Sequence, residues 1–243
     1  MIFKNGRETQ RIRGADPKAL DAAVKSLAGE ASTSDSSSSG SSGTTWLGAS
    51  LPRGYSDITS SVEVQGLDFL NLDSAAGKAR SIFETNQPSS TSKGKSTAEG
   101  DKDWIESDTD EQLMLFVPFQ STVKVHTLHI TSCPPEDDEE VIRPKTIHIY
   151  MNRSNVLGFD EADSVPATQT ISLDESSWDA KTATAKVELR FVKFQNVTSL
   201  VVFIADGEGD GEKTRIDRIR IIGETGETRK MGKLEKIGDE QGE

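Results

Sequence analysis

Cysteine is nearly missing from this chain of 243 residues, in which Cys133 stands alone. A single cysteine excludes a disulfide within the chain, and it equally excludes a dithiol active site. Chains without disulfides are typical of reducing compartments. We therefore predict the cytoplasm as the location of the protein, with the nucleus as a second one.

Long apolar runs are missing as well. No stretch of the sequence approaches the roughly 20 apolar residues that a membrane-spanning helix needs. The first residues also lack the apolar core of a secretory signal peptide. We therefore expect no membrane among the partners of this chain.

Positive charge is scarce, because 28 Lys and Arg stand against 40 Asp and Glu, for a net charge of -12. Proteins bind nucleic acids and anionic membranes mainly by placing Lys and Arg against phosphates. The composition therefore argues against nucleic acid and favours a basic surface of another protein as the partner. Only 33% of the residues are hydrophobic, so we expect part of the chain to stay unburied.

The N-terminal segment 1–30 has the pattern of a strand, a turn and a helix. Asn5-Gly6 is typical of a tight turn. Asp16 and Pro17 suit the start of a helix, because Asp caps free N–H groups and Pro lacks one. The apolar residues of the predicted helix share one face, and they are Leu20, Val24 and Leu27.

Polar stretches separate the rest of the chain into segments. Residues 31–45 are rich in Ser and Gly, which predicts a flexible linker. Residues 89–103 are again polar and predict a loop. The segment 224–243 is charged and poor in apolar residues, so we expect a disordered acidic tail.

The region from Trp104 to Gly223 contains many strand-length runs with a period close to two. These runs are residues 113–117, 123–130, 145–150, 168–173, 187–192, 200–205 and 216–222. Turn residues separate them, and we find no amphipathic helix between them. Short strands without crossover helices pair antiparallel, so we predict a mainly β fold, either a sandwich or a jelly roll.

The residues that could carry chemistry favour no catalytic site. Cys133 is followed by the acidic run 136–140, and nearby carboxylates raise the pKa of a thiol. The histidines, His126, His129 and His148, lack the spacing of a zinc site, and no nucleophile elbow is present. On a regular strand His126 would share a face with Leu128 and Ile130.

One stretch imitates a calcium loop. Between Asp206 and Asp217 carboxylates recur at alternate positions, with Gly211 sixth and Asp217 twelfth, as in an EF-hand. Strand-like runs flank it instead of helices, and its twelfth residue is the shorter Asp. We therefore predict a solvated hairpin loop, no metal and no other cofactor.

Two acidic groups are candidates for a partner surface. Glu136, Asp137 and Asp138 belong to a run that is either a solvated loop or a docking surface for a basic patch. Asp108, Asp110 and Glu111 precede the first strong strand, where capping and turn roles are the alternative to binding.

Several motifs of the β region resemble the PITH domain, the C-terminal module of thioredoxin-like proteins associated with the proteasome. They are Glu106-Ser-Asp-Thr-Asp-Glu-Gln-Leu113, Val117-Pro-Phe119, Val192-Lys-Phe-Gln-Asn-Val197, Ser199-Leu-Val-Val-Phe203 and Lys213-Thr-Arg-Ile216. Phe3-Lys-Asn-Gly6 with Arg11-Ile-Arg-Gly-Ala-Asp-Pro17 is similar to the last strand pair and final helix of a thioredoxin domain. The Cys-x-x-Cys of such a domain is absent.

This resemblance implies a fold and a function. The fold is an antiparallel jelly-roll β-sandwich of the galactose-binding-like type, preceded by a short thioredoxin remnant. The expected domains are a thioredoxin C-terminal remnant (1–30), the linker (31–45), the PITH domain (46–223) and the tail (224–243). Thr214 and Arg215 lie in a family motif and become further candidates for the partner surface, with pairing between Arg215 and the acids of the segment 108–111 as the alternative.

The function implied is that of a non-catalytic interaction module, which binds the regulatory particle of the 26S proteasome as a monomer. One alternative is a thioredoxin-type disulfide oxidoreductase, provided that a longer parent protein restores the Cys-x-x-Cys. Another is a carbohydrate-binding jelly roll, but this rests on fold analogy alone, and only 6% of the residues are aromatic. The sequence therefore favours an adaptor over an enzyme.

Overall fold

The computed structural model describes residues 2–4, 7–10, 45–91 and 102–226, and the chain divides into two compact units, Met1–Gly43 and Thr44–Glu243. In the first unit, β1 (Ile2–Lys4) and β2 (Arg7–Gln10) pair antiparallel, as the predicted turn between them requires. The predicted helix after Asp16, most of the linker, most of the loop 89–103 and most of the tail lie outside the described residues.

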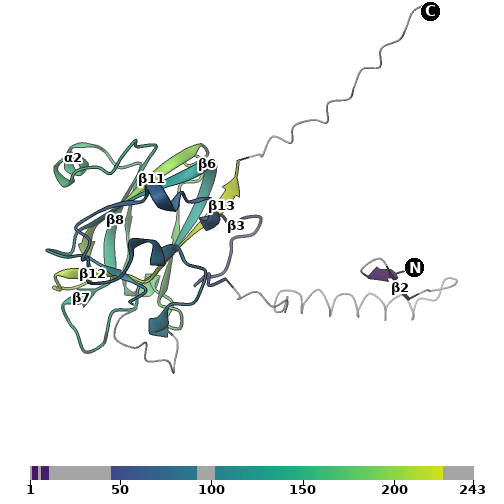
Figure 1. Cartoon of the computed structure of the whole chain (residues 1–243), viewed down its shortest axis with the longest axis horizontal. Coiled ribbons are helices and arrows are strands. Elements are labelled where there is room, and N and C mark those ends of the chain that lie inside the picture. Colours follow the sequence, from purple (N-terminus) through teal and green to yellow (C-terminus); the bar gives the residue numbers. More distant parts are fainter. Residues whose placement is uncertain (1, 5–6, 11–44, 92–101, 227–243) are drawn as a thin grey trace, which may run out of the picture. The chain divides into compact units, whose positions relative to one another are not determined.

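The second unit is mainly β (Figure 1). Its strands are β3 (Ser56–Asp57), β4 (Asp68–Leu70), β5 (Ile105–Glu106), β6 (Leu113–Thr131), β7 (Val141–Ile142), β8 (Pro144–Met151), β9 (Gln169–Ser172), β10 (Thr184–Glu188), β11 (Val197–Gly207), β12 (Lys213–Ile216) and β13 (Arg218–Thr225). Its helices are the short α2 (Phe159–Ser164) and the 3-10 turns η1 (Thr59–Ser61), η2 (Val64–Gly66), η3 (Ala79–Phe83), η4 (Ser89–Thr91) and η5 (Glu175–Ser177).

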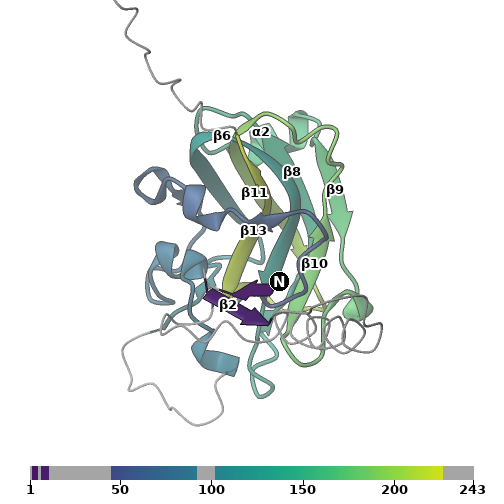
Figure 2. The ribbon, with the colours of Figure 1, turned by 90° about the vertical axis from the view of Figure 1, so that its right-hand side faces the viewer.

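Strand β6 belongs to both sheets of the sandwich. Its first half pairs with β4 and β11, and β8 and β9 continue this front sheet. Its second half pairs with β13 and β10, and β3 completes this back sheet. All of these pairs are antiparallel, which confirms the predicted jelly-roll sandwich, and Figure 2 shows β6, β11, β8 and β9 in succession.

The core explains the apolar run at the start of β6. Leu113, Leu115 and Val117 belong to the large cluster between the sheets. Met114 and Phe116 point the other way, into a second cluster on the outer face of the front sheet. A sheet that is buried on both faces needs apolar residues at every position, so this strand does not alternate.

Helix α2 covers that outer face, which corrects the prediction that no helix lies between the strands. Ala162 is buried in the second cluster beside Val201 and Phe203 of β11, and Phe159 packs against them. The phenol of Tyr150 donates to the carbonyl of Ala162 at 3.0 Å and ties the helix to β8. The helix has only six residues, too short to show an amphipathic period in the sequence.

The second half of β6 contains a β-bulge at His126. Ile222 of β13 pairs with Thr127, whereas the next residue, Gly223, pairs with Val125, so His126 is an extra residue. The bulge reverses the alternation, and both Val125 and Leu128 reach the core. The prediction that His126 shares the face of Leu128 is therefore wrong. Its ring lies 4.1 Å from that of Tyr55, centroid to centroid.

Candidate functional site

A small three-stranded sheet brings three loops together. In it β12 pairs antiparallel with β5, through Arg215 and Glu106, and parallel with β7, through Lys213 and Val141. The end of β5 and the starts of β7 and β12 therefore lie at the same end of this small sheet. The loop 107–112 leaves β5 there, and the loops 136–140 and 208–212 enter β7 and β12 there.

Asn71 fixes the loop 107–112. This residue has the left-handed φ of 60°, which Asn tolerates better than most residues. Its side-chain amide donates to Asp110 Oδ1 at 2.7 Å and to the Gln112 carbonyl at 2.6 Å. Its Oδ1 accepts the backbone N–H of Thr109 at 3.0 Å. Asp110 therefore helps to form the turn, which is the role that the sequence offered as the alternative to binding.

The loops 136–140 and 208–212 pack directly against each other. The backbone N–H of Lys213 donates to the Glu140 carbonyl at 2.9 Å. A Cβ added at Gly211 would lie 2.7 Å from that same carbonyl oxygen and 2.6 Å from Ile142 Cγ2. The close approach of the two loops therefore depends on glycine at this position.

The carboxylates of these loops form one acidic surface, which we term the acidic end. It comprises Asp108, Asp110, Glu111, Glu136, Asp137, Asp138, Glu139, Glu140, Glu208, Asp210 and Glu212. Glu111 and Glu208 are half-buried and the other members are exposed. Within the described part of the chain none of them forms an ion pair, and no three acidic, His or Cys side chains are placed to hold a metal ion. The carboxylates thus present charge outward instead of converging on a cation.

Thr214 and Arg215 support this surface from inside. The Thr214 hydroxyl is buried and donates to the Glu111 carbonyl at 2.7 Å. Arg215 is 4% exposed, makes two hydrogen bonds to Asp217 and lies 3.9 Å from the ring centroid of Trp104. The expectation that these two side chains face a partner does not fit their burial.

Two further arginines are buried under the N-terminal arm (residues 45–91) of this unit, although no motif in the sequence indicates them. Arg218 and Arg220 alternate along β13 with Ile219 and Ile221, which enter the core. Such alternation predicts arginines exposed on the outer face of a sheet. The arm covers that face, and no local pattern in the sequence indicates this.

The contacts of these arginines tie the arm to the back sheet. Arg218 Nη2 lies 2.6 Å from Asp103 Oδ2, and its Nε donates to the Asn86 carbonyl at 3.0 Å. Burial alone would raise the pKa of Asp103, but hydrogen bonds from Ser89 and Arg218 lower it below its usual value. Arg220 Nε donates to the Trp46 carbonyl at 2.8 Å. Asp103 is therefore an ionised, fully engaged carboxylate.

Cys133 lies beside this network. Its backbone N–H donates to Asp217 Oδ2 at 2.8 Å. Burial, followed by the charge of Asp217, raises the pKa of its thiol to about 11. The thiol is therefore protonated at neutral pH, which makes it a poor nucleophile.

The three histidines make structural contacts. The Nδ1 atoms of His126, His129 and His148 lie 2.7 to 2.9 Å from Thr127 Oγ1, the Leu47 carbonyl oxygen and Thr170 Oγ1. His129 is buried, and the other two are only partly exposed. None of these contacts pairs a histidine with Cys133 or with the acidic end.

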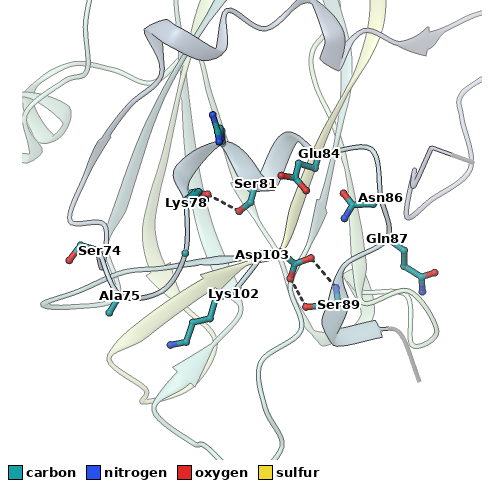
Figure 3. Close-up of a pocket in the computed structure, with 12 residues that line it drawn as sticks. Ser74, Ala75, Lys78, Ser81, Glu84, Asn86, Gln87, Ser89, Lys102 and Asp103 are labelled. Carbon is teal, nitrogen blue, oxygen red and sulfur yellow. Dashed lines mark hydrogen bonds between the residues drawn. The ribbon is translucent and has the colours of Figure 1, made fainter. Parts of the chain in front are cut away.

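A cavity of about 650 Å³ lies beside the acidic end, between residues 74–89 and 102–103. Figure 3 shows Asp103 between Ser89 on one side and Lys102 on the other, with Asn86 and Gln87 along one wall. This polar cavity was not predicted from the sequence, because it depends on how the segments 74–89 and 102–103 fold against each other.

The family of the chain follows from comparison with known proteins. A family model described as the PITH domain matches residues 48–239, so the chain belongs to the PITH family. It is 34% identical to Thioredoxin-like protein 1 of Schizosaccharomyces pombe, over 98% of this chain and 72% of that protein. It is 27% identical to human PITH domain-containing protein 1, over 70% of each chain.

Solved structures that are similar to the chain at low sequence identity include carbohydrate-binding proteins. The family 32 module of NanJ from C. perfringens, in complex with galactose, is 10% identical with a TM-score of 0.42, over 69% of this chain and 98% of that one. A fucolectin from striped bass (Morone saxatilis) is 11% identical with a TM-score of 0.44, over 70% and 49%. Similarity at this level says nothing about the ligands of this chain.

Proposed function

We propose that this chain is a non-catalytic interaction module that binds the regulatory particle of the 26S proteasome through its acidic end. The observation that carries the proposal is the convergence of three acidic loops around β12. Membership of the PITH family supports it, because the resemblance in the motifs implies that partner. The module acts as a monomer in the cytoplasm and, as a second location, in the nucleus.

The construction of the acidic end suits a docking surface. Its loops are fixed by Asn71, Thr214 and Gly211, so little loop entropy is lost when a partner binds. Its carboxylates are mostly exposed and stay hydrated, so their charges act at long range and steer a basic partner. The acidic end therefore speeds and orients the encounter with a positively charged surface.

A redox function receives no support from this chain. Thiol–disulfide exchange needs a thiolate, and the pKa of about 11 at Cys133 keeps this thiol protonated. No second cysteine exists in the sequence to resolve a mixed disulfide. A thioredoxin-type activity would have to come from a different polypeptide segment.

A binding experiment with reversed charges tests the proposal. The full chain, carrying an affinity tag, is incubated with purified regulatory particle at low salt, and the bound fraction is measured. We expect the wild type to bind and the triple variant Glu136→Lys, Asp137→Lys, Asp138→Lys to bind at least about tenfold more weakly, because like charges then face the partner.

The matched control reverses three acidic residues on segments that lie beside β6 instead. The backbone N–H of Glu63 donates to the Pro118 carbonyl, and Asp68 and Glu188 stand opposite Phe116 and Thr127 in the ladders of β4 and β10. The control variant Glu63→Lys, Asp68→Lys, Glu188→Lys should bind like the wild type. If the wild type does not bind the particle at all, the proposed partner is wrong. If both variants lose binding equally, the acidic end is not the docking surface.

A further inference from the structure

Three positively charged side chains surround the cavity between residues 74–89 and 102–103. Lys78, Arg80 and Lys102 line it, and all three are exposed. Among the described residues none of the three has an ion-pair partner, whereas other lysines, such as Lys124 and Lys145, pair with acids. In a chain of net charge -12, three unpaired cations around one cavity are unexpected.

The acidic side chains of the cavity do not neutralise these cations. Asp103 is held by Arg218, at 2.6 Å, and by the hydroxyl and backbone N–H of Ser89. Its charge is therefore matched by the buried Arg218 beneath it. Glu84 is exposed, forms no ion pair among the described residues and offsets only one of the three positive charges. The surroundings of the cavity thus keep a surplus of positive charge.

Neutral donors complete the lining. Ser74 and Asn86 also line the cavity, and their side chains have no hydrogen-bond partner within the described ranges 45–91 and 102–226. A hydroxyl and a carboxamide can each donate to an anionic oxygen. Together with the three cations they offer more donors than a single carboxylate can accept.

The walls of the cavity are preformed. Gly77 bridges to Asp103, and its φ of 117° together with the carbonyl oxygens of Lys102 and Trp104, each 2.5 Å from an added Cβ, leaves room only for glycine. The turn that carries Lys78 and Arg80 is anchored because the next residues, Ile82 and Phe83, are buried in the core. A volume of about 650 Å³ lies in the range of small-molecule sites.

We propose that this cavity binds a phosphate monoester, either as a free small molecule or as a phosphorylated side chain of a partner. A phosphate monoester carries nearly two negative charges and three acceptor oxygens, which match the three cations and the neutral donors. The site adjoins the acidic end, shares none of its residues and has the opposite charge. It does not depend on the proteasome proposal.

Titration with inorganic phosphate tests the site directly. Backbone amide shifts of the ¹⁵N-labelled full chain are recorded at constant ionic strength, with sodium chloride as the balancing salt. We expect saturable shifts confined to residues 74–89 and 102–103. If a phosphoserine peptide shifts the same amides and binds more tightly than the same peptide with Asp in place of phosphoserine, the source is a modified side chain. If phosphate binds and the peptide does not, the source is a small molecule.

Two triple variants decide whether the cavity or the general charge is responsible. Lys78→Gln, Arg80→Gln, Lys102→Gln should weaken phosphate binding at least about tenfold, because charge-assisted hydrogen bonds are lost. The control Lys181→Gln, Arg190→Gln, Lys193→Gln removes the same charge from exposed positions elsewhere and should bind like the wild type. Shifts that do not saturate, or equal weakening in both variants, would overturn the proposal. Because all substituted side chains are exposed, both variants should keep the wild-type melting temperature.

Discussion

Two buried arginines hold the N-terminal arm against the back sheet. Arg218 and Arg220 are 0% and 2% exposed, and most of their hydrogen bonds go to backbone carbonyls of the arm and to Asp103. A guanidinium stays charged even when it is buried, so its desolvation must be offset by partners on every side. The back sheet is therefore stable only when the arm lies over it and supplies hydrogen-bond acceptors to both arginines.

Arg218→Met should destabilise the fold strongly. The substitution keeps much of the side-chain volume but removes the charged partner of the Asp103 carboxylate and the donor to three backbone carbonyls, those of Asn86, Asp103 and Asp217. Breaking a buried pair in this way typically costs about 3–5 kcal/mol of unfolding free energy. Urea denaturation measures the effect. The exposed pair of Lys145 with Asp206 is the control, and Lys145→Met should change stability by less than about 1 kcal/mol. Equal effects at the two positions would contradict the burial argument.

The buried His129 predicts a pH dependence of stability. Burial lowers its pKa, with nearby Lys186 adding to the shift and the Leu47 carbonyl and Asp57 opposing it. Since the folded pKa lies below the unfolded value of about 6.5, the unfolded chain binds the proton first as pH falls. The contribution of His129 is therefore present above about pH 6.5 and is lost as pH falls through the folded pKa.

A comparison with His129→Asn isolates this contribution. The amide of Asn can still donate to the Leu47 carbonyl but does not titrate. Thermal unfolding between pH 5 and pH 8 should show a difference between wild type and variant that shrinks as the pH falls below about 6.5. A difference that is constant across this range would show that His129 titrates alike in both states.

At the scale of elements, periodicity located most strands but missed their continuity. The runs 113–117 and 123–130 were expected as separate strands and form the single β6, because the strand continues through the exposed polar residues 120–122, which the pairing with β11 skips. The expected strand 187–192 is shifted, since β10 spans Thr184–Glu188 and Val192 is 89% exposed. A bulge, a shared strand and the arm over β13 depend on distant pairings, which periodicity cannot report.

The bulge of β6 makes Gly223 a sensitive position in β13. A Cβ at this residue would collide with the backbone carbonyl of Lys124, which cannot move without breaking the ladder. Gly223→Ala should therefore lower the unfolding free energy by about 1–3 kcal/mol, as overpacking does elsewhere. Chemical denaturation gives the value. Gly158→Ala, where no atom lies within 4 Å of the added Cβ, is the control and should be nearly neutral.

At the scale of the whole molecule, charge is distributed unevenly over the second unit. The acidic end and the cation-lined cavity adjoin each other, because Asp73, which precedes Ser74 of the lining, lies 3.9 Å from Lys213 and donates its backbone N–H to the Glu106 carbonyl, next to the loop 107–112. The acidic residues were recognised one motif at a time in the sequence. Their convergence was not, because it depends on the parallel pairing of β12 with β7, which closes a loop of some seventy residues.

Salt should slow the association of the module with the proteasome particle. Charges of the acidic end are screened over about 8 Å at physiological ionic strength, so steering weakens as salt is added. Stopped-flow measurements should show an association rate that falls with ionic strength and a dissociation rate that changes much less. An association rate that is independent of salt would mean that the acidic end takes no part in the encounter.

The place of β13 in the back sheet has a consequence for synthesis on the ribosome. This strand ends at Thr225 and lies between β3 and β6, which are made far earlier. The second half of β6 therefore leaves the exit tunnel with both edges unpaired, because β10 and β13 are made later, and the edge that β13 fills stays open until nearly all of the described chain is made. Nascent chains with open strand edges are prone to aggregate and attract chaperones. A chain that stops before residue 218 cannot complete its back sheet, so translation must reach β13 before this unit folds.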